Sequence, residues 1–242
     1  YSELQPYIEN KFYYGAIIGR FANRLKNGYA KLSHGTIQAD INTDTGHHIH
    51  GGSKGSCYKN WQILEQSQSH VVYEFLSNSS LKIEISATTD AETLCSFAHH
   101  SYFNLKGGGT IEGHELQIEA DHYIDVDSQG IPLDLCNVNK RPFDFRVKKK
   151  LSSSEALDHN FCISNYRTKI KNVAKLSYES VSMDLMSSEP GLQVYTGHKL
   201  GVALEPQLWP DAPNNEFYPS ALLGPNEKYL QETILRFSDK NL

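Results

Sequence analysis

The acidic and imidazole side chains of this sequence suggest general acid–base chemistry at two places. Glu205 lies in the apolar string Val-Ala-Leu-Glu-Pro, where an ionised carboxylate is costly unless it is paired. Burial raises the pKa of a carboxyl, so Glu205 is a candidate general base as well as a candidate structural residue. His100 ends a stretch typical of a buried strand, where a histidine is more often a hydrogen-bonded structural residue than a catalytic one.

Further polar residues have both a functional and a structural interpretation. His48 and His50 form an H-x-H pair that could chelate a metal, but no third ligand occurs at a diagnostic spacing, so hydrogen-bonded loop histidines are favoured. Arg24 is either a surface charge or a fork of donors for ligand oxygens. Asp158 begins a further polar string, and Trp209 is either a core residue or a platform for the apolar face of a sugar.

Composition excludes several classes of protein. The 242 residues carry 23 Lys and Arg against 28 Asp and Glu, a net charge of −5, which argues against binding to nucleic acid or an anionic membrane. The sequence has no run of 18 apolar residues and no phosphate-binding loop, G-x-S-x-G or H-E-x-x-H motif. Its four cysteines form no C-x-x-C pair, which is typical of reduced thiols in a cytoplasmic protein.

The elements that must position these residues are strands. Residues 81–85, 115–120 and 181–185 alternate between apolar and polar side chains, which predicts strands with one buried face. Branched and aromatic runs between turn signals predict more strands, at residues 71–76, 94–103, 192–195, 202–204 and 228–237. We expect short helices at residues 22–26 and 153–157. Residues 1–242 are therefore predicted to form a single all-β domain, a large sandwich or barrel of antiparallel sheets.

Several strings, in this order, resemble the aldose 1-epimerase (galactose mutarotase) family, and they extend from residue 14 to residue 213. The strings are Tyr14-Gly-Ala-Ile-Ile-Gly-Arg-Phe-Ala-Asn-Arg24, Ile49-His-Gly-Gly52, His100-Ser-Tyr-Phe-Asn-Leu105, Asp121-His-Tyr123, Pro142-Phe-Asp-Phe-Arg146, Asp158-His-Asn-Phe161, Pro190-Gly-Leu-Gln-Val-Tyr-Thr-Gly197, Leu204-Glu-Pro-Gln207 and Trp209-Pro-Asp-Ala-Pro213. The resemblance implies a large antiparallel β-sandwich of the galactose mutarotase-like supersandwich type with few short helices.

The resemblance also implies an activity and a set of site residues. The expected reaction interconverts the α and β anomers of free aldohexoses such as galactose and glucose, with no cofactor and no metal. By this resemblance Glu205 is the general base and His100 the general acid. The sugar hydroxyls would be held by Arg24, Asn23, His50, Asp158 and Gln193. The expected partner is a free monosaccharide, bound by a cytoplasmic monomer or homodimer.

Three other functions remain open at this point. One is that of a relative acting on hexose 6-phosphates, which would need extra basic residues at the rim of the pocket. A glycoside hydrolase on the same architecture would need two carboxylates across the bond that it cleaves, for example Glu205 with Asp158 or Asp211. A non-catalytic sugar-binding protein would keep Arg24, His50 and Asp158 without the acid–base pair. The discriminating observation is whether His100 or a second carboxylate faces Glu205.

The sequence departs from the family pattern mainly in length. The pattern predicts further strands before Tyr1, a loop and strand between Ser80 and Leu81, and a loop between Leu200 and Gly201. We expect these residues to be missing from the sequence rather than deleted from the natural chain, since loops are where disorder concentrates. His99 also stands where an Asn is more usual.

Overall fold

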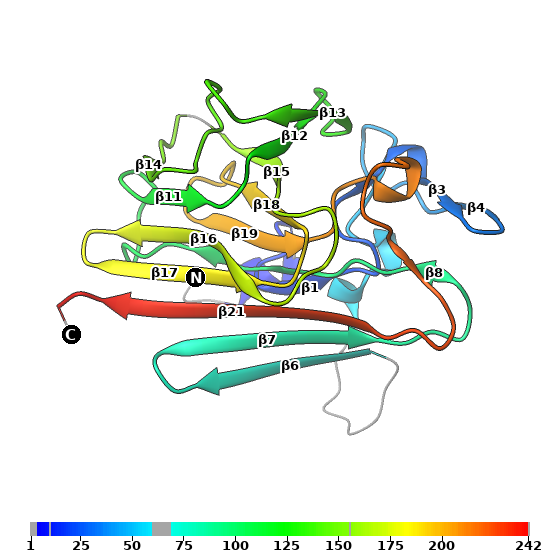
Figure 1. Ribbon diagram of the computed structural model, residues 1–242, viewed down its shortest axis with the longest axis horizontal. Coiled ribbons are helices and arrows are strands. Elements are labelled where there is room, and N and C mark those ends of the chain that lie inside the picture. The colour runs from blue at the N-terminus through cyan, green and yellow to red at the C-terminus, as the bar shows by residue number, and fades with distance from the viewer. Residues whose placement is uncertain (1–3, 10, 60–68, 155, 242) are drawn as a thin grey trace.

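Two large antiparallel sheets form most of the computed structural model, which describes residues 4–9, 11–59, 69–154 and 156–241 (Figure 1). The six-stranded sheet has, in spatial order, β10 (Tyr102–Phe103), β19 (Val202–Gln207), β18 (Gly191–Tyr195), β15 (Asp158–Cys162), β12 (His122–Val126) and β13 (Pro132–Asn137). The seven-stranded sheet has β14 (Lys149–Lys150), β11 (Glu115–Ile118), β16 (Lys171–Tyr178), β17 (Val181–Ser187), β21 (Tyr229–Asp239), β7 (Ser80–Ala87) and β6 (Ser69–Leu76).

Shorter elements complete the described part of the chain. The two-stranded sheets are β1 (Ala16–Ile18) with β9 (Ala98–His100), β2 (Arg24–Leu25) with β5 (His48–Ile49), β3 (Tyr29–Leu32) with β4 (Gly35–Gln38), and β8 (Thr93–Leu94) with β20 (Leu222–Leu223). The helices are α1 (Gln5–Glu9) and the 3-10 turns Lys26–Gly28, Gly52–Lys54, Ser56–Tyr58 and Ala212–Asn214. No helix in the described ranges is long and apolar enough to cross a membrane.

The apolar faces of the two large sheets enclose a common core. Leu192 and Val194 of β18 and Leu204 of β19 belong to the same buried cluster as Met183 and Leu185 of β17. All five side chains are at most 2% exposed. This packing of one sheet on the other confirms the predicted all-β sandwich with few short helices, and it fixes which face of each strand points inward.

The opposite face of the six-stranded sheet is polar, because side chains alternate along a strand. Gln193 on β18 lies directly opposite Asn160 on β15 and Glu205 on β19. Tyr195, two residues further along β18, lies opposite Asp158. The register of three neighbouring strands therefore places an acid, an amide and a second acid side by side on one surface.

Most strand predictions are confirmed, with differences where one segment meets several partners. Residues 81–85 lie in β7, 181–185 in β17 and 115–118 in β11. The single strand expected at residues 94–103 is instead three short ones, because β8, β9 and β10 pair with three different strands, β20, β1 and β19.

Both helix predictions are wrong for the residues that the structure describes. Asn23 and Asn27 have φ of 63° and 54°, a left-handed conformation that ends helical hydrogen bonding. Arg24 and Leu25, between them, pair with β5. At residues 153–157 the chain forms a turn at Ser153 and Ser154, and residue 155 lies outside the described ranges.

Candidate active site

All seven site residues expected from the sequence line one cavity on the polar face of the six-stranded sheet. Its volume is about 220 Å³, below the range of about 300–1,000 Å³ typical of sites for drug-sized ligands, so it suits a small molecule. The lining includes Asn23, Arg24, His50, His100, Asp158, Gln193 and Glu205. We call it the His100–Glu205 cavity.

His100 and Glu205 face each other at the bottom of this cavity. Nε2 of His100 lies 3.5 Å from Oε1 of Glu205, and the two residues are only 5% and 2% exposed. Burial, and next the charge of Asp158, raise the pKa of the Glu205 carboxyl well above its usual range. Burial lowers the pKa of His100 to about 4. Between these limits the pair holds one dissociable proton, on either the carboxyl or the imidazole, with the same net charge in both forms.

His50 is held in one orientation by the backbone of Asn23. The backbone N–H of His50 donates to the backbone carbonyl of Asn23 at 3.1 Å, and the backbone N–H of Asn23 donates to Nδ1 of His50 at 3.2 Å. Burial, followed by the neighbouring His100, lowers the pKa of His50 well below its usual range. A neutral imidazole whose Nδ1 accepts a hydrogen bond carries its proton on Nε2, so His50 can offer an N–H donor through Nε2.

The position after His50, which Gly51 occupies, has room only for a glycine. Its φ is +83°, and a Cβ at this position would lie 1.9 Å from the carbonyl oxygen of Gly19. Any side chain here would displace the turn that presents His50.

Asp158, Gln193 and Arg24 form a polar group at the mouth of the cavity. Nε2 of Gln193 donates to Oδ1 of Asp158 at 2.6 Å, and Nη2 of Arg24 lies 4.0 Å from Oδ2 of Asp158. The Asp158 side chain is 43% exposed and that of Arg24 21%, so both charges remain accessible to a ligand. Gly130 lies under the Arg24 guanidinium, since a Cβ on it would be 2.7 Å from Cζ of Arg24.

Three tyrosines that the sequence analysis did not single out also line the cavity. The Tyr13 ring lies 4.8 Å from that of His50, and the Tyr102 ring lies 5.2 Å from that of His100, measured between centroids. Tyr102 and Tyr195 each follow a predicted site residue by two positions, His100 and Gln193. Gln193 and Tyr195 share one face of β18, so this spacing is the signal that could have found Tyr195. His100 and Tyr102 lie on two successive strands, β9 and β10.

Several residues that the sequence analysis left open have structural partners. Oδ1 of Asp211 accepts from the Lys26 amide at 3.0 Å and from Nδ2 of Asn214 at 2.6 Å, and Asp211 does not line the cavity. Trp209 is 3% exposed and donates Nε1–H to the carbonyl of Pro190 at 2.9 Å, so it is a core residue and not a sugar platform.

The H-x-H pair does not form a metal site with neighbours that the structure describes. Nδ1 of His48 lies 2.9 Å from the carbonyl oxygen of Asp40, whereas His50 belongs to the cavity. Within the described ranges, no three His, Cys, Asp or Glu side chains gather in a way that could hold a metal ion. His48 is therefore a hydrogen-bonded structural histidine, as predicted, but it lies on strand β5 and not in a loop.

Comparison with known proteins identifies the family. Residues 1–79 and 68–236 match the family model described as aldose 1-epimerase. The chain is 30% identical to galactose mutarotase of Bos taurus over 285 aligned positions, which cover 98% of this chain and 82% of that protein. It is 28% identical to aldose 1-epimerase of Escherichia coli, with 96% and 82% covered.

Solved structures agree with this result. A crystal structure of an aldose epimerase homologue from C. elegans has a TM-score of 0.89 at 25% identity, over 99% of this chain and 86% of that one. Galactose 1-epimerase from Lactobacillus acidophilus has the same fold, with a TM-score of 0.83 at 24% identity over 98% and 83% of the two chains. The chain therefore belongs to the aldose 1-epimerase family, a family of isomerases.

Proposed function

We propose that this protein interconverts the α and β anomers of a free aldohexose such as galactose or glucose. The observation that carries the proposal is the pair of His100 and Glu205, buried 3.5 Å apart in a small cavity lined by hydrogen-bonding groups. Mutarotation needs a base at the C1 hydroxyl and an acid at the ring oxygen, and this pair can supply both. The names of the relatives, galactose mutarotase and aldose 1-epimerase, agree with the reaction.

Ring opening begins from the ionic form of the pair. The Glu205 carboxylate takes the proton of the C1 hydroxyl, and the bond between C1 and the ring oxygen breaks as the C1 carbonyl forms. The electron pair of the broken bond goes to the ring oxygen, which takes a proton from the His100 imidazolium. The products are the open-chain aldehyde, a neutral carboxyl and a neutral imidazole, which is the form of the pair that burial favours.

Ring closure reverses these proton transfers on the other face of C1. After rotation about the C1–C2 bond, His100 takes the proton of the C5 hydroxyl while the oxygen of that hydroxyl attacks C1. Glu205 returns a proton to the carbonyl oxygen, and the pair is restored. No hydride, metal or covalent nucleophile is needed, because only one carbon–oxygen bond breaks and reforms. Each well-placed acid or base typically raises the rate of such a step by about 10²–10⁴-fold.

The remaining polar residues would orient the sugar so that C1 and the ring oxygen face Glu205 and His100. Arg24 can donate two hydrogen bonds to sugar oxygens, and Asp158 can accept from hydroxyls. His50 offers a donor through Nε2. Oε1 of Gln193 is buried without a protein hydrogen-bond partner in the described structure, which makes it available to a hydroxyl. Asn23 contributes by fixing His50.

The geometry favours an epimerase over a hydrolase and over a binding protein. A retaining or inverting hydrolase would place a second carboxylate opposite Glu205, but the group that faces it at 3.5 Å is His100. Asp158, the other carboxylate of the cavity, accepts a hydrogen bond from Gln193 and lies beside Arg24. A pure binding protein has no need for a buried carboxyl with a raised pKa beside a buried imidazole whose Nδ1 has no hydrogen-bond partner in the described structure, because such burial costs stability.

Polarimetry on freshly dissolved α-D-galactose and α-D-glucose tests the proposed function. We expect the protein to accelerate the relaxation of optical rotation to the anomeric equilibrium in proportion to its concentration. Relaxation at the uncatalysed rate with every free aldose would contradict the proposal and favour the binding protein. Release of a free sugar from a glycoside would favour the hydrolase.

A further inference from the structure

The proposed acid and base lie on strands that are not hydrogen-bonded to each other. His100 is the last residue of β9, which pairs with β1, whereas Glu205 lies on β19 between β10 and β18. Among the strands that the structure describes, no backbone ladder joins β9 to β19, so none sets the 3.5 Å between the two side chains. Their separation must be fixed elsewhere in the fold, because a misplacement of about 1 Å can cost about a hundredfold in rate.

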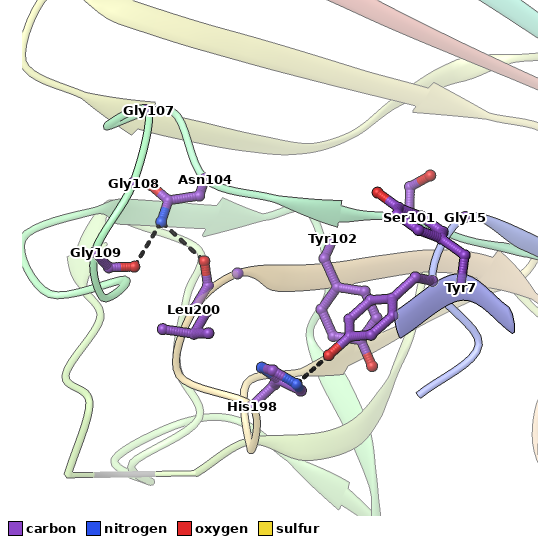
Figure 2. Close-up of a pocket in the computed structure, with 12 residues that line it drawn as sticks. Tyr7, Gly15, Ser101, Tyr102, Asn104, Gly107, Gly108, Gly109, His198 and Leu200 are labelled. Carbon is purple, nitrogen blue, oxygen red and sulfur yellow. Dashed lines mark hydrogen bonds between the residues drawn. The ribbon is translucent and has the colours of Figure 1, made fainter. Parts of the chain in front are cut away.

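One end of the span that carries the two residues is closed by a ladder. Tyr102 of β10 (Figure 2) lies opposite Ala203 of β19. His100 is two residues before Tyr102, and Glu205 is two residues after its partner, so the antiparallel register, if continued, would set the acid opposite the base. The ladder stops at Tyr102, because His100 pairs with Ala16 of β1 instead.

The other end of the span is closed by two side chains of β21, which belongs to the seven-stranded sheet. The hydroxyl of Tyr229 accepts from the backbone N–H of Phe97 at 3.1 Å and donates to Oε1 of Gln231 at 2.8 Å. Nε2 of Gln231 donates to the backbone carbonyl of Pro206 at 2.8 Å. Phe97 directly precedes β9, and Pro206 directly follows Glu205. We call these three successive hydrogen bonds the Tyr229–Gln231 link.

The link is buried, and its residue types are unusual for a core. Tyr229 and Gln231 occupy inward positions of β21 and are 3% and 2% exposed. The Tyr229 ring packs edge to face against that of Phe97, with centroids 5.7 Å apart. A buried amide is costly unless it is hydrogen-bonded, and a leucine at position 231 would avoid that cost. Gln231 instead uses both groups of its amide to join two other side-chain and backbone partners.

We propose that Tyr229 and Gln231 are positioning residues, and that the Tyr229–Gln231 link sets the separation of His100 and Glu205 at which the two groups exchange protons with the sugar. This inference rests on the proposed function. Phe97 is three residues from His100, and Pro206 is one from Glu205, so a shift at the link reaches both side chains. Tyr229 and Gln231 do not line the His100–Glu205 cavity, so the link acts on the chemical step and not on sugar binding.

The test removes the link while keeping the shapes of its side chains. Tyr229→Phe deletes the hydroxyl, and Gln231→Met replaces the amide with an apolar chain of similar length. The matched control is Tyr123→Phe on β12, because Tyr123 is 2% exposed and its hydroxyl accepts from Nη1 of Arg141 at 3.4 Å. Urea unfolding identifies conditions in which every variant is folded. Polarimetry on fresh α-D-galactose then gives kcat and KM.

We expect Tyr229→Phe and Gln231→Met each to lower kcat about tenfold and to leave KM within about twofold of the native value. Tyr123→Phe should change neither. The loss should be smaller than that caused by removing His100 itself, because the backbone N–H of Leu208 still donates to Oγ of Ser96 at 3.3 Å and joins the same two segments. Native kcat in both folded variants of the link would overturn the proposal.

A second measurement separates positioning from a general loosening of the structure. In the His100→Gln background, Tyr229→Phe should lower kcat further by less than about twofold, because the separation that the link sets no longer matters when the acid is absent. A tenfold loss that persists in this background would overturn the proposal. If the native protein does not accelerate mutarotation, the proposed function itself fails, whereas a native protein that is active and insensitive to Tyr229→Phe refutes the link alone.

Discussion

Two glutamates of this protein are equally buried and differ in their partners. Glu189, just before β18, is 0% exposed, and Glu205 on β19 is 2% exposed. Each is followed by a proline. Glu189 accepts a hydrogen bond from Nε of Arg167 at 2.7 Å, while Glu205 lies 3.5 Å from Nε2 of His100.

The difference teaches that burial alone does not mark a catalytic carboxylate. Burial raises the pKa of both glutamates, but at Glu189 the Arg167 charge opposes that rise. A guanidinium does not give up its proton in proteins, so Glu189 and Arg167 form a permanent ion pair. An imidazole can give up its proton, and Glu205 also borders a cavity, so its pair can exchange a proton with a ligand.

The largest expected effect comes from breaking the pair that exchanges a proton. We expect His100→Gln to lower kcat/KM for galactose at least about a hundredfold, because the ring oxygen then loses its acid. The two groups act as a unit. The double variant His100→Gln with Glu205→Gln should therefore lose much less kcat/KM than the product of the two single-variant fold-losses. Polarimetry on the single and double variants measures this, and fully multiplicative losses would contradict a shared proton.

Breaking the permanent pair should affect stability instead of catalysis. Removing one partner of a buried pair costs about 3–5 kcal/mol, and because the Arg167 side chain is 30% exposed we expect Glu189→Gln to cost about 3 kcal/mol, near the lower end of that range. Urea unfolding gives the value from the shift in midpoint. Kinetics of the folded protein should be unchanged.

A surface pair provides the matched control. Lys82 and Glu232 lie 2.9 Å apart on half-exposed strands, and Glu232→Gln should cost less than about 1 kcal/mol. Glu205→Gln should not lower stability at neutral pH, because the folded state disfavours the ionised form of Glu205. An equal loss of stability from Glu189→Gln and Glu232→Gln would remove the distinction between a buried and a surface pair.

The pH dependence of catalysis sharpens the same comparison. Below about pH 4 His100 becomes protonated while Glu205 remains a neutral carboxyl, so the pair lacks a base. As the pH rises through the raised pKa of Glu205, the pair loses its one proton and lacks an acid. We therefore expect kcat/KM, measured by polarimetry across buffers, to be constant from near pH 4 up to the raised pKa of Glu205 and to fall above it. An acidic limb near the ordinary histidine pKa of about 6.5 would contradict the assigned order of titration.

A smaller effect should come from the mouth of the cavity. Asp158→Asn removes a charged hydrogen-bond acceptor, so we expect KM to rise about tenfold. It should also move the alkaline limb of the pH profile to lower pH, because the Asp158 charge is one cause of the raised pKa of Glu205. The control Asp134→Asn, at an exposed position on β13, should change neither. A higher KM with an unmoved alkaline limb would show that Asp158 does not act on Glu205.

The sequence could predict one of the two glutamates because of its surroundings. Glu205 stands in an apolar string, so its burial was expected, whereas Glu189 stands in the polar string Ser-Ser-Glu-Pro and its burial depends on Arg167, 22 residues away in the chain. Alternation of apolar and polar residues predicted β7, β11 and β17, and branched or aromatic runs predicted β6, β18, β19 and β21, whereas β12, β13, β15 and β16 were not predicted. Neither pattern could show that residues 94–103 divide among three partners.

The make-up of the cavity also followed partly from the sequence. The family strings contained all seven expected residues, but their proximity depends on register, which sets Gln193 opposite Glu205 and Asp158 opposite Tyr195. Gly130 belongs to none of the family strings, although it lies against the Arg24 guanidinium. Contacts between distant segments leave no trace in local periodicity.

The most direct test of the central claim compares Glu205→Gln with Glu189→Gln, under conditions in which both variants are folded. The measurement is the polarimetric relaxation rate of fresh α-D-galactose at equal protein concentration and neutral pH. We predict that Glu205→Gln lowers kcat/KM at least about a hundredfold while Glu189→Gln keeps the native value. A native rate in Glu205→Gln would contradict the claim that its carboxyl is the base of the reaction.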